Sequence, residues 1–147
     1  MRILGFNFTK LAGERTKTMN TPHSINVNVE FLDLVKDKID FIKDDEVFNI
    51  LYKYGVLYTD KDDKTKKIAE IAFEGNLILS TTKEEAKDIL KHWKKKELPS
   101  EVKVFLYNVI LNKCAIKTIQ LQDELTLPSQ FLRIPQVSSE QEKTPNK

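Results

Sequence analysis

The side chains that most often carry chemistry are few and scattered in this 147-residue chain. The histidines are His23, in a turn-like Thr-Pro-His-Ser, and His92, in a run with helical spacing, and Cys114 is the one cysteine. Metal sites and nucleophilic triads need several such groups to converge, and no ligand spacing is present. One cysteine also excludes an intrachain disulfide. We therefore expect a structural or solvent role for all three residues.

Carboxylates, glycines and lysines give no stronger signal for catalysis. The strings Asp44-Asp45-Glu46 and Asp62-Asp63 pair carboxylates, but both fall in predicted turns, where acidic residues serve solubility and turn geometry. The four glycines are too far apart for a phosphate loop. In KHWKKK, at 91–96, Trp93 is in phase with a predicted buried stripe, and the lysines fall where cations favour a helix end. We predict no cofactor or metal and no enzyme.

Composition narrows the class of protein further. Lys and Arg total 24 against 22 Asp and Glu, so the net charge of +2 gives no field that points to nucleic acid or an anionic membrane. The length favours one domain, predicted over 1–137, and the polar residues 138–147 are predicted to be a disordered tail. The chain has no signal-peptide pattern and no run of ~18 apolar residues, so we expect a cytoplasmic protein without membrane insertion.

Alternating apolar residues predict four strands in the first half of the chain, over about 2–9, 25–31, 48–58 and 69–79. The third and fourth should form an antiparallel hairpin around the charged turn TDKDDKTKK. The connector at 11–24 is too long for a tight hairpin, so the first two strands need not be neighbours. Gly75 falls on the buried register, which indicates a bulge or a close approach by a helix.

Two helices are predicted in the second half, giving an α+β fold. Thr82 and Glu85 have the spacing of a capping box, and Leu98-Pro99 separates the first helix from a second that runs from Ser100 into the 120s. The second helix is apolar around most of its circumference, so a partner subunit or a bound ligand must cover its outer side. The residues expected at such an oligomer interface are Val104, Tyr107, Leu111 and Ile116.

Several strings, in this order, resemble the bacterial SecB export chaperones and their shorter SecB-like relatives in archaea and in chaperone-linked toxin–antitoxin systems. They are Phe8-Thr9-Lys10, INVNVEF at 25–31, VFNILYKYGVLY at 47–58, IAEIAFEGNLIL at 68–79, the Leu-Pro break and LQDELTLP. The resemblance covers roughly residues 3–135. It rests on the order in which these strings follow one another along the chain, since no single motif is diagnostic.

The resemblance implies a four-stranded antiparallel sheet with two helices packed on one face, assembled through the helices as a tetramer, or dimer of dimers. It also implies an ATP-independent holdase that binds unfolded polypeptide segments in apolar grooves. The family presents an acidic sheet surface to a translocation motor, and the residues at matching positions are Glu70 and Glu74. The tail lacks a counterpart to the family's motor-binding end.

The client groove has to be built differently from that of bacterial members. In the family, the connector after the first strand carries aromatic residues that help to line the groove, whereas the connector here has none. The groove wall should then come from other aromatic side chains, and the client-binding candidates are Phe31, Phe41, Tyr52, Tyr54 and Phe131.

The leading functional hypothesis is a chaperone that holds unfolded or preprotein segments by burying their apolar side chains. The first alternative is an interaction module dedicated to one partner, such as an antitoxin, without general holdase activity. The second is a small-ligand or enzyme role, which a deep pocket with buried ionisable groups would favour.

Overall fold

The computed structural model describes residues 1–16, 23–37 and 45–129. Phe41, Phe131 and the predicted tail at 138–147 lie outside these ranges. The elements are β1 (Arg2–Arg15), β2 (His23–Asp37), β3 (Glu46–Asp60), β4 (Lys67–Thr81), α1 (Lys83–Trp93) and α2 (Ser100–Glu124). The predicted α+β fold, with its four strands and two helices, is confirmed.

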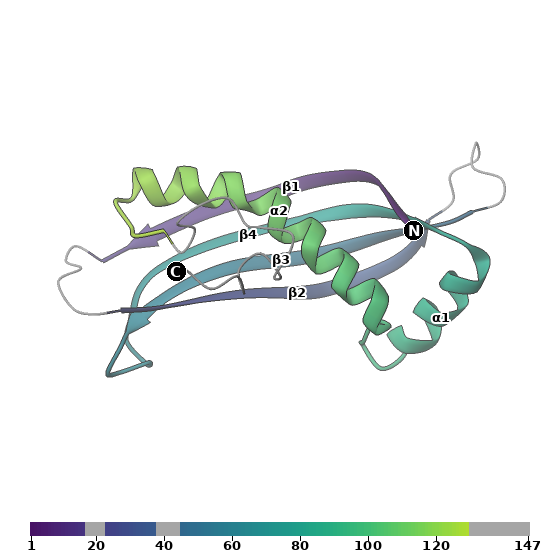
Figure 1. Cartoon of the computed structure of the whole chain (residues 1–147), viewed down its shortest axis with the longest axis horizontal. Helices are drawn as coiled ribbons and strands as arrows, with labels where there is room; N and C mark the ends of the chain where they lie inside the picture. The colour runs from purple at the N-terminus through teal and green to yellow at the C-terminus, as the bar shows by residue number, and fades with distance from the viewer. Residues whose placement is uncertain (17–22, 38–44, 130–147) are drawn as a thin grey trace, which may run out of the picture.

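The strands form one antiparallel sheet in the order β1-β4-β3-β2. β1 and β2 therefore lie at opposite edges and are not neighbours in the sheet. α2 lies over one face, here called the inner face, and crosses it obliquely from the β2 edge to the β1 edge (Figure 1). α1 lies at the ends of the strands beside the start of α2, and its Ala86 and Ile89 belong to the same core. Neither of the two described helices lies over the opposite, outer face. The oblique crossing leaves part of the inner face of β2 uncovered.

β1 differs from its prediction in where it ends and in which residues face the core. It was expected to end at Thr9, but it pairs with β4 as far as Arg15, and a register shift between Phe8 and Lys10 rephases the strand. A second shift, between Ile3 and Gly5, places Ile3 against the core and leaves Leu4 38% exposed. Strict alternation along the strand would place Leu4 on the same face as Phe6 and Phe8, but Leu4 does not share their face, because a bulge changes which residues point the same way.

Gly75 marks the predicted close approach, but the approaching segment is β1 and not a helix. A Cβ at this position would collide with the backbone oxygen of Asn7 and would lie 2.6 Å from the Tyr52 hydroxyl. That hydroxyl donates a hydrogen bond to the Asn7 carbonyl at 3.1 Å. The register shift of β1 follows directly after Phe8, which pairs with Gly75.

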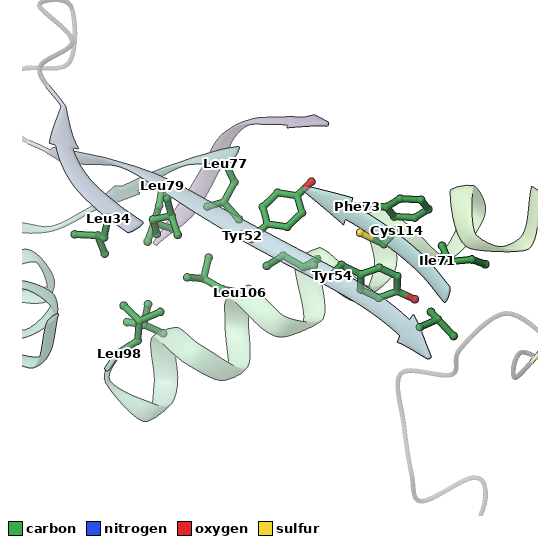
Figure 2. Close-up of a cluster of buried hydrophobic side chains, with 14 of the residues drawn as sticks. Leu34, Tyr52, Tyr54, Ile71, Phe73, Leu77, Leu79, Leu98, Leu106 and Cys114 are labelled. Carbon is green, nitrogen blue, oxygen red and sulfur yellow. The ribbon is translucent and has the colours of Figure 1, made fainter. Parts of the chain in front are cut away.

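The hydrophobic core lies between the inner face and the two helices. Its largest fully buried side chains come from β3 and β4 and from one side of each helix: Phe48, Ile50, Tyr52, Tyr54, Tyr58, Ile71, Phe73, Leu77, Leu79, Ile89, Leu106 and Ile110. Figure 2 shows several of them facing one another between the strands and α2. Burial of each such aliphatic or aromatic side chain contributes about 1.5–3 kcal/mol to folding.

The helices begin where local chemistry predicted. The Glu85 backbone N–H donates to Thr82 Oγ1 at 3.2 Å, and the Thr82 N–H donates to Glu85 Oε1 at 2.9 Å, which completes the capping box of α1. Pro99 occupies the N-cap of α2, directly before the first helical residue, Ser100.

Side-chain hydrogen bonds fix α2 along the sheet. Thr118 Oγ1 donates to the Tyr54 hydroxyl at 3.2 Å, and Gln122 Nε2 donates to the Tyr58 hydroxyl at 2.7 Å. The Arg15 guanidinium donates to the carbonyls of Leu125 and Thr126, both at 3.1 Å, just after the end of α2. A shift of α2 along its axis would break these bonds together.

Candidate functional site: an aromatic groove between β2 and α2

The inner face of β2 is the incompletely covered part of the core. Ile25, Val27, Val29 and Phe31 alternate on this face, as predicted, with Val27 41% exposed and the other three half-buried. They remain accessible because α2 leaves β2 as it crosses toward β1 (Figure 1). Apolar side chains on a strand edge are thus available to a partner.

A groove of about 490 Å³ lies between this part of β2, the start of α2 and the turn that joins the helices. Its lining residues are Val29, Glu30, Phe31, Trp93, Lys96, Glu97, Leu98, Ser100, Lys103 and Tyr107. The capping box of α1 and the Pro99 start of α2 place the joining turn at this point. Three elements and one turn therefore contribute to a single open groove.

Aromatic rings form the wall of the groove. The rings of Phe31 and Tyr107 stack with their centroids 5.4 Å apart and their planes 10° from parallel. Lys103 Nζ lies 5.6 Å from the Tyr107 ring centroid, and Lys96 Nζ lies 5.2 Å from the centroid of the half-buried Trp93. Each ammonium group is held by the ring quadrupole while it remains at the rim. The groove therefore combines apolar walls with charged edges.

The charges at the rim have both signs. Lys96 and Lys103 lie among the lining residues together with Glu30 and Glu97, so the formal charges cancel. Among the described residues, no group of three or more His, Cys, Asp or Glu is placed to hold a metal ion. Such a groove suits the burial of apolar side chains beside polar backbone, with little preference for the sign of the ligand's charge.

The described client-binding candidates lie in two different environments. Phe31 lies in the groove, whereas Tyr52 and Tyr54 are 0% exposed and cannot contact a client in this structure. This corrects the expectation for the two tyrosines, which α2 covers (Figure 2). Their burial also raises the pKa of the Tyr52 hydroxyl well above its usual value.

Sequence reasoning missed two of the groove's aromatic residues. Trp93 was assigned to the buried stripe of the first helix, and Tyr107 to the outer side of the second. The run of lysines around Trp93 was the available signal, because a ring at the end of a lysine-rich helix lies close to solvent. The position of Tyr107 depends on the oblique crossing of α2, which periodicity does not determine.

The candidate oligomer residues divide into two pairs. Val104 is 59% exposed and Ile116 is 66% exposed, and both belong to the solvent side of α2. Tyr107 and Leu111 are half-buried, Leu111 against the core and Tyr107 against the ring of Phe31. Ile119, 39% exposed, extends the apolar solvent side of the helix. We call Val104, Ile116 and Ile119 the α2 outer stripe.

The outer face of the sheet is not uniformly acidic. Glu70 pairs with Lys67 at 3.3 Å, and Glu74 pairs with Lys10 at 3.7 Å. Lys53 lines a shallow hollow of about 270 Å³ together with both glutamates. Positive and negative side chains therefore alternate around the two acidic residues that the sequence singled out.

Neither described helix combines the length and the apolar character needed to cross a bilayer.

A four-stranded antiparallel sheet with two helices on one face is the SecB-like fold. A solved structure that shares it is the SecB-like chaperone Rv1957 of Mycobacterium tuberculosis, in complex with a ChAD peptide from the HigA1 antitoxin Rv1956. The similarity has a TM-score of 0.50 and 15% sequence identity, and it covers 93% of this chain and 91% of that one. No protein-family model and no curated protein matches the chain by sequence. The comparison thus establishes the fold.

Proposed function

We propose that this protein is a cytoplasmic chaperone of the SecB-like kind, which holds non-native polypeptide segments without using nucleotide. The observation that carries the proposal is the open aromatic groove beside the exposed inner face of β2. It is supported by the shared fold with a SecB-like chaperone that was solved with a peptide bound.

Binding follows from burial of apolar side chains. An extended client segment places alternate side chains on one side, and these pack against Val29, Phe31 and Tyr107. Each well-buried side chain contributes about 1.5–3 kcal/mol, so several contacts give useful affinity without sequence specificity. The Lys and Glu side chains of the rim accept clients with flanking charges of either sign.

The same proposal includes self-assembly through the α2 outer stripe. Val104 and Ile116 are large apolar side chains exposed on one helix, and a second copy of the chain would remove them from water. In the proposed tetramer, a dimer of dimers, the α2 outer stripe of one copy would be covered by another copy. The alternating charges of the outer face give a translocation motor no acidic surface, so the proposed activity is a holdase without a motor.

The direct test is suppression of aggregation of an unfolding test protein at a near-stoichiometric ratio and without nucleotide. We expect suppression by the parent chain and by Asn108→Ala, whose side chain lies on the exposed side of α2. Tyr107→Ala, in the groove, should require several-fold more chaperone. Absence of suppression, together with no binding to a permanently unfolded chain, would refute the proposal.

A second candidate is a chaperone dedicated to one partner, such as an antitoxin. It is favoured by one observation, the antitoxin peptide in the complex of the structural neighbour. Affinities for a set of unrelated unfolded polypeptides separate the two candidates. A general holdase binds most of the set within about one order of magnitude, whereas a dedicated chaperone binds one peptide far more tightly than the rest.

A further inference from the structure

Both helices end in a turn whose left-handed residue is not glycine. After α1, the Lys96 N–H donates to Trp93 O at 2.8 Å, the Glu97 N–H donates to His92 O at 3.3 Å, and Lys96 has a φ of 59°. Thr126, with a φ of 53°, occupies the same place after α2. Glycine is the usual residue at such a position, because a Cβ disfavours the left-handed backbone. A lysine there is strained, which indicates that its side chain has a use.

The Lys96 side chain lies at the aromatic groove. Lys96 is exposed and lines the groove, and its Nζ lies 5.2 Å from the centroid of the Trp93 ring. Within the described part of the chain, neither Lys96 nor the neighbouring exposed Glu97 forms an ion pair. Thr126 does not line this groove, and its carbonyl is held by Arg15. Glycine at position 96 would keep the turn and remove the ammonium group, so this group is what the lysine adds.

The charges around the groove are unevenly placed, although they sum to zero. Lys96 and Lys103 each lie over a ring of the wall. The Glu30 carboxylate instead accepts a hydrogen bond from Asn28 Nδ2 at 3.0 Å, on the outer face of β2. A client side chain that packs on Trp93 also covers the ammonium group on that ring and removes water from it. A partly buried charge needs an opposite charge or a hydrogen-bond acceptor to offset this loss.

We propose that Lys96 gives the groove a preference for client segments that carry a carboxylate beside the apolar side chain that packs on Trp93. The inference rests on the proposed holdase function and names the kind of client that this part of the groove selects. The aspartate or glutamate of such a client accepts hydrogen bonds from the Lys96 ammonium group as the ring becomes covered. Apolar burial supplies most of the affinity, so the carboxylate modulates binding and is not required for it.

Two labelled peptides test the preference. Both are tryptophan-free and permanently unfolded, and their alternating apolar residues are flanked on each side by aspartate in one peptide and by asparagine in the other. Aspartate and asparagine have nearly the same shape, and flanks on both sides make the result independent of the direction in which the peptide lies. Fluorescence anisotropy gives the two dissociation constants. The parent protein should bind the aspartate peptide about three- to five-fold more tightly, as expected for an ion pair open to solvent on one side.

Substitutions assign the preference to residue 96. Lys96→Gln removes the charge and keeps a long side chain, so the two peptides should bind with equal affinity. Lys95→Gln is the matched control, because Lys95 is an exposed lysine of the same run that does not line the groove, and the preference should persist. Lys96→Gly should abolish the preference as Lys96→Gln does. Because glycine favours the φ of this position, that result guards against a misfolded Lys96→Gln protein.

The outcomes separate this inference from the function on which it rests. Equal binding of the two peptides by the parent protein would overturn the role of Lys96 and leave the holdase function intact, as would a preference that persists in Lys96→Gln. An equal loss of preference in Lys95→Gln would also overturn it, because net charge would then be the cause. Failure of the parent protein to bind either peptide would overturn both the inference and the proposed function.

Discussion

At the residue scale, hydrogen bonds to the tyrosine hydroxyls explain how the aromatic side chains of β3 can be buried in the core. Tyr52, Tyr54 and Tyr58 lie on the inner face of β3, and each hydroxyl has a hydrogen-bond partner: Asn7 O, Thr118 Oγ1, and Gln122 Nε2 together with Pro128 O. A buried phenol needs such a partner, since burying it unpaired costs stability. Strand periodicity predicted the shared face, but the partners come from β1, α2 and the segment after it, which no local pattern reveals.

Glu85 gives a pH-dependent prediction at this scale. Its hydrogen bond from the Thr82 backbone N–H holds the pKa of the carboxyl below its usual value of 4.5. A carboxyl group whose pKa is lower in the folded state contributes stability above its unfolded pKa and loses that contribution as the pH falls through the folded pKa. Glu85→Ala should therefore lower the free energy of unfolding at pH 7 by about 0.5–1 kcal/mol.

The difference between Glu85→Ala and the parent should shrink as the pH falls below about 4.5, as measured by urea unfolding at several pH values. Glu84→Ala is the control, because it removes an acidic side chain from the same helical turn without breaking the capping box. Unfolding free energies of Glu85→Ala and parent that stay parallel from pH 7 to pH 3 would contradict the assignment.

At the element scale, the strands and helices could be predicted, but not where each residue faces around a bulge. Alternation over 25–31 and 69–79 gave strands, and Thr82 with Glu85 gave the start of α1, because these are local patterns. The extension of β1 to Arg15 was missed, since a bulge breaks the period-two pattern. The contribution of Tyr107 to the groove was missed, because its ring stacks on Phe31 only as a result of the angle at which α2 crosses the sheet.

Gly75 provides the test at this scale. A methyl group there would collide with the Asn7 carbonyl of β1 and crowd the Tyr52 hydroxyl, so Gly75→Ala should destabilise the fold by about 1–3 kcal/mol. Gly55→Ala is the control, because its added Cβ would meet only Ile71 O, at an ordinary 3.7 Å. Chemical denaturation measures both changes, and equal stability of the two variants would show that β1 does not approach Gly75 this closely.

At the scale of the whole molecule, apolar side chains remain exposed among the described residues after the core is formed, and two groups of them bear on the proposed function. The α2 outer stripe faces solvent, and the inner face of β2 is open beside the groove. The hydrogen bonds of Thr118 and Gln122 to tyrosine hydroxyls of β3 hold α2 in its orientation. A rotation of the helix that buried its outer stripe would break these bonds. The exposed apolar side of the second helix could be predicted from its composition. The groove could not, because it is formed by the way β2, α1 and α2 pack together.

A charge on the α2 outer stripe should prevent assembly without unfolding the chain. Ile116 is 66% exposed, so aspartate there costs the monomer little, whereas in a contact between copies it would be buried without a partner. We expect Ile116→Asp to lower the mass measured by light scattering at least two-fold with unchanged circular dichroism. Asn7→Asp, exposed on β1 and not part of α2, is the control. A parental mass for Ile116→Asp would exclude this stripe as an interface.

Trp93 offers the most direct measurement of client binding at the groove, because it is the one tryptophan of the chain and lines that groove. A tryptophan-free, permanently unfolded polypeptide with a fluorescent label is titrated against the protein, and label anisotropy and Trp93 emission are recorded together. Client binding in the groove predicts a saturable shift of the Trp93 emission to shorter wavelength, with the same midpoint as the anisotropy. Saturating anisotropy with unchanged Trp93 emission, or no binding at all, would contradict it.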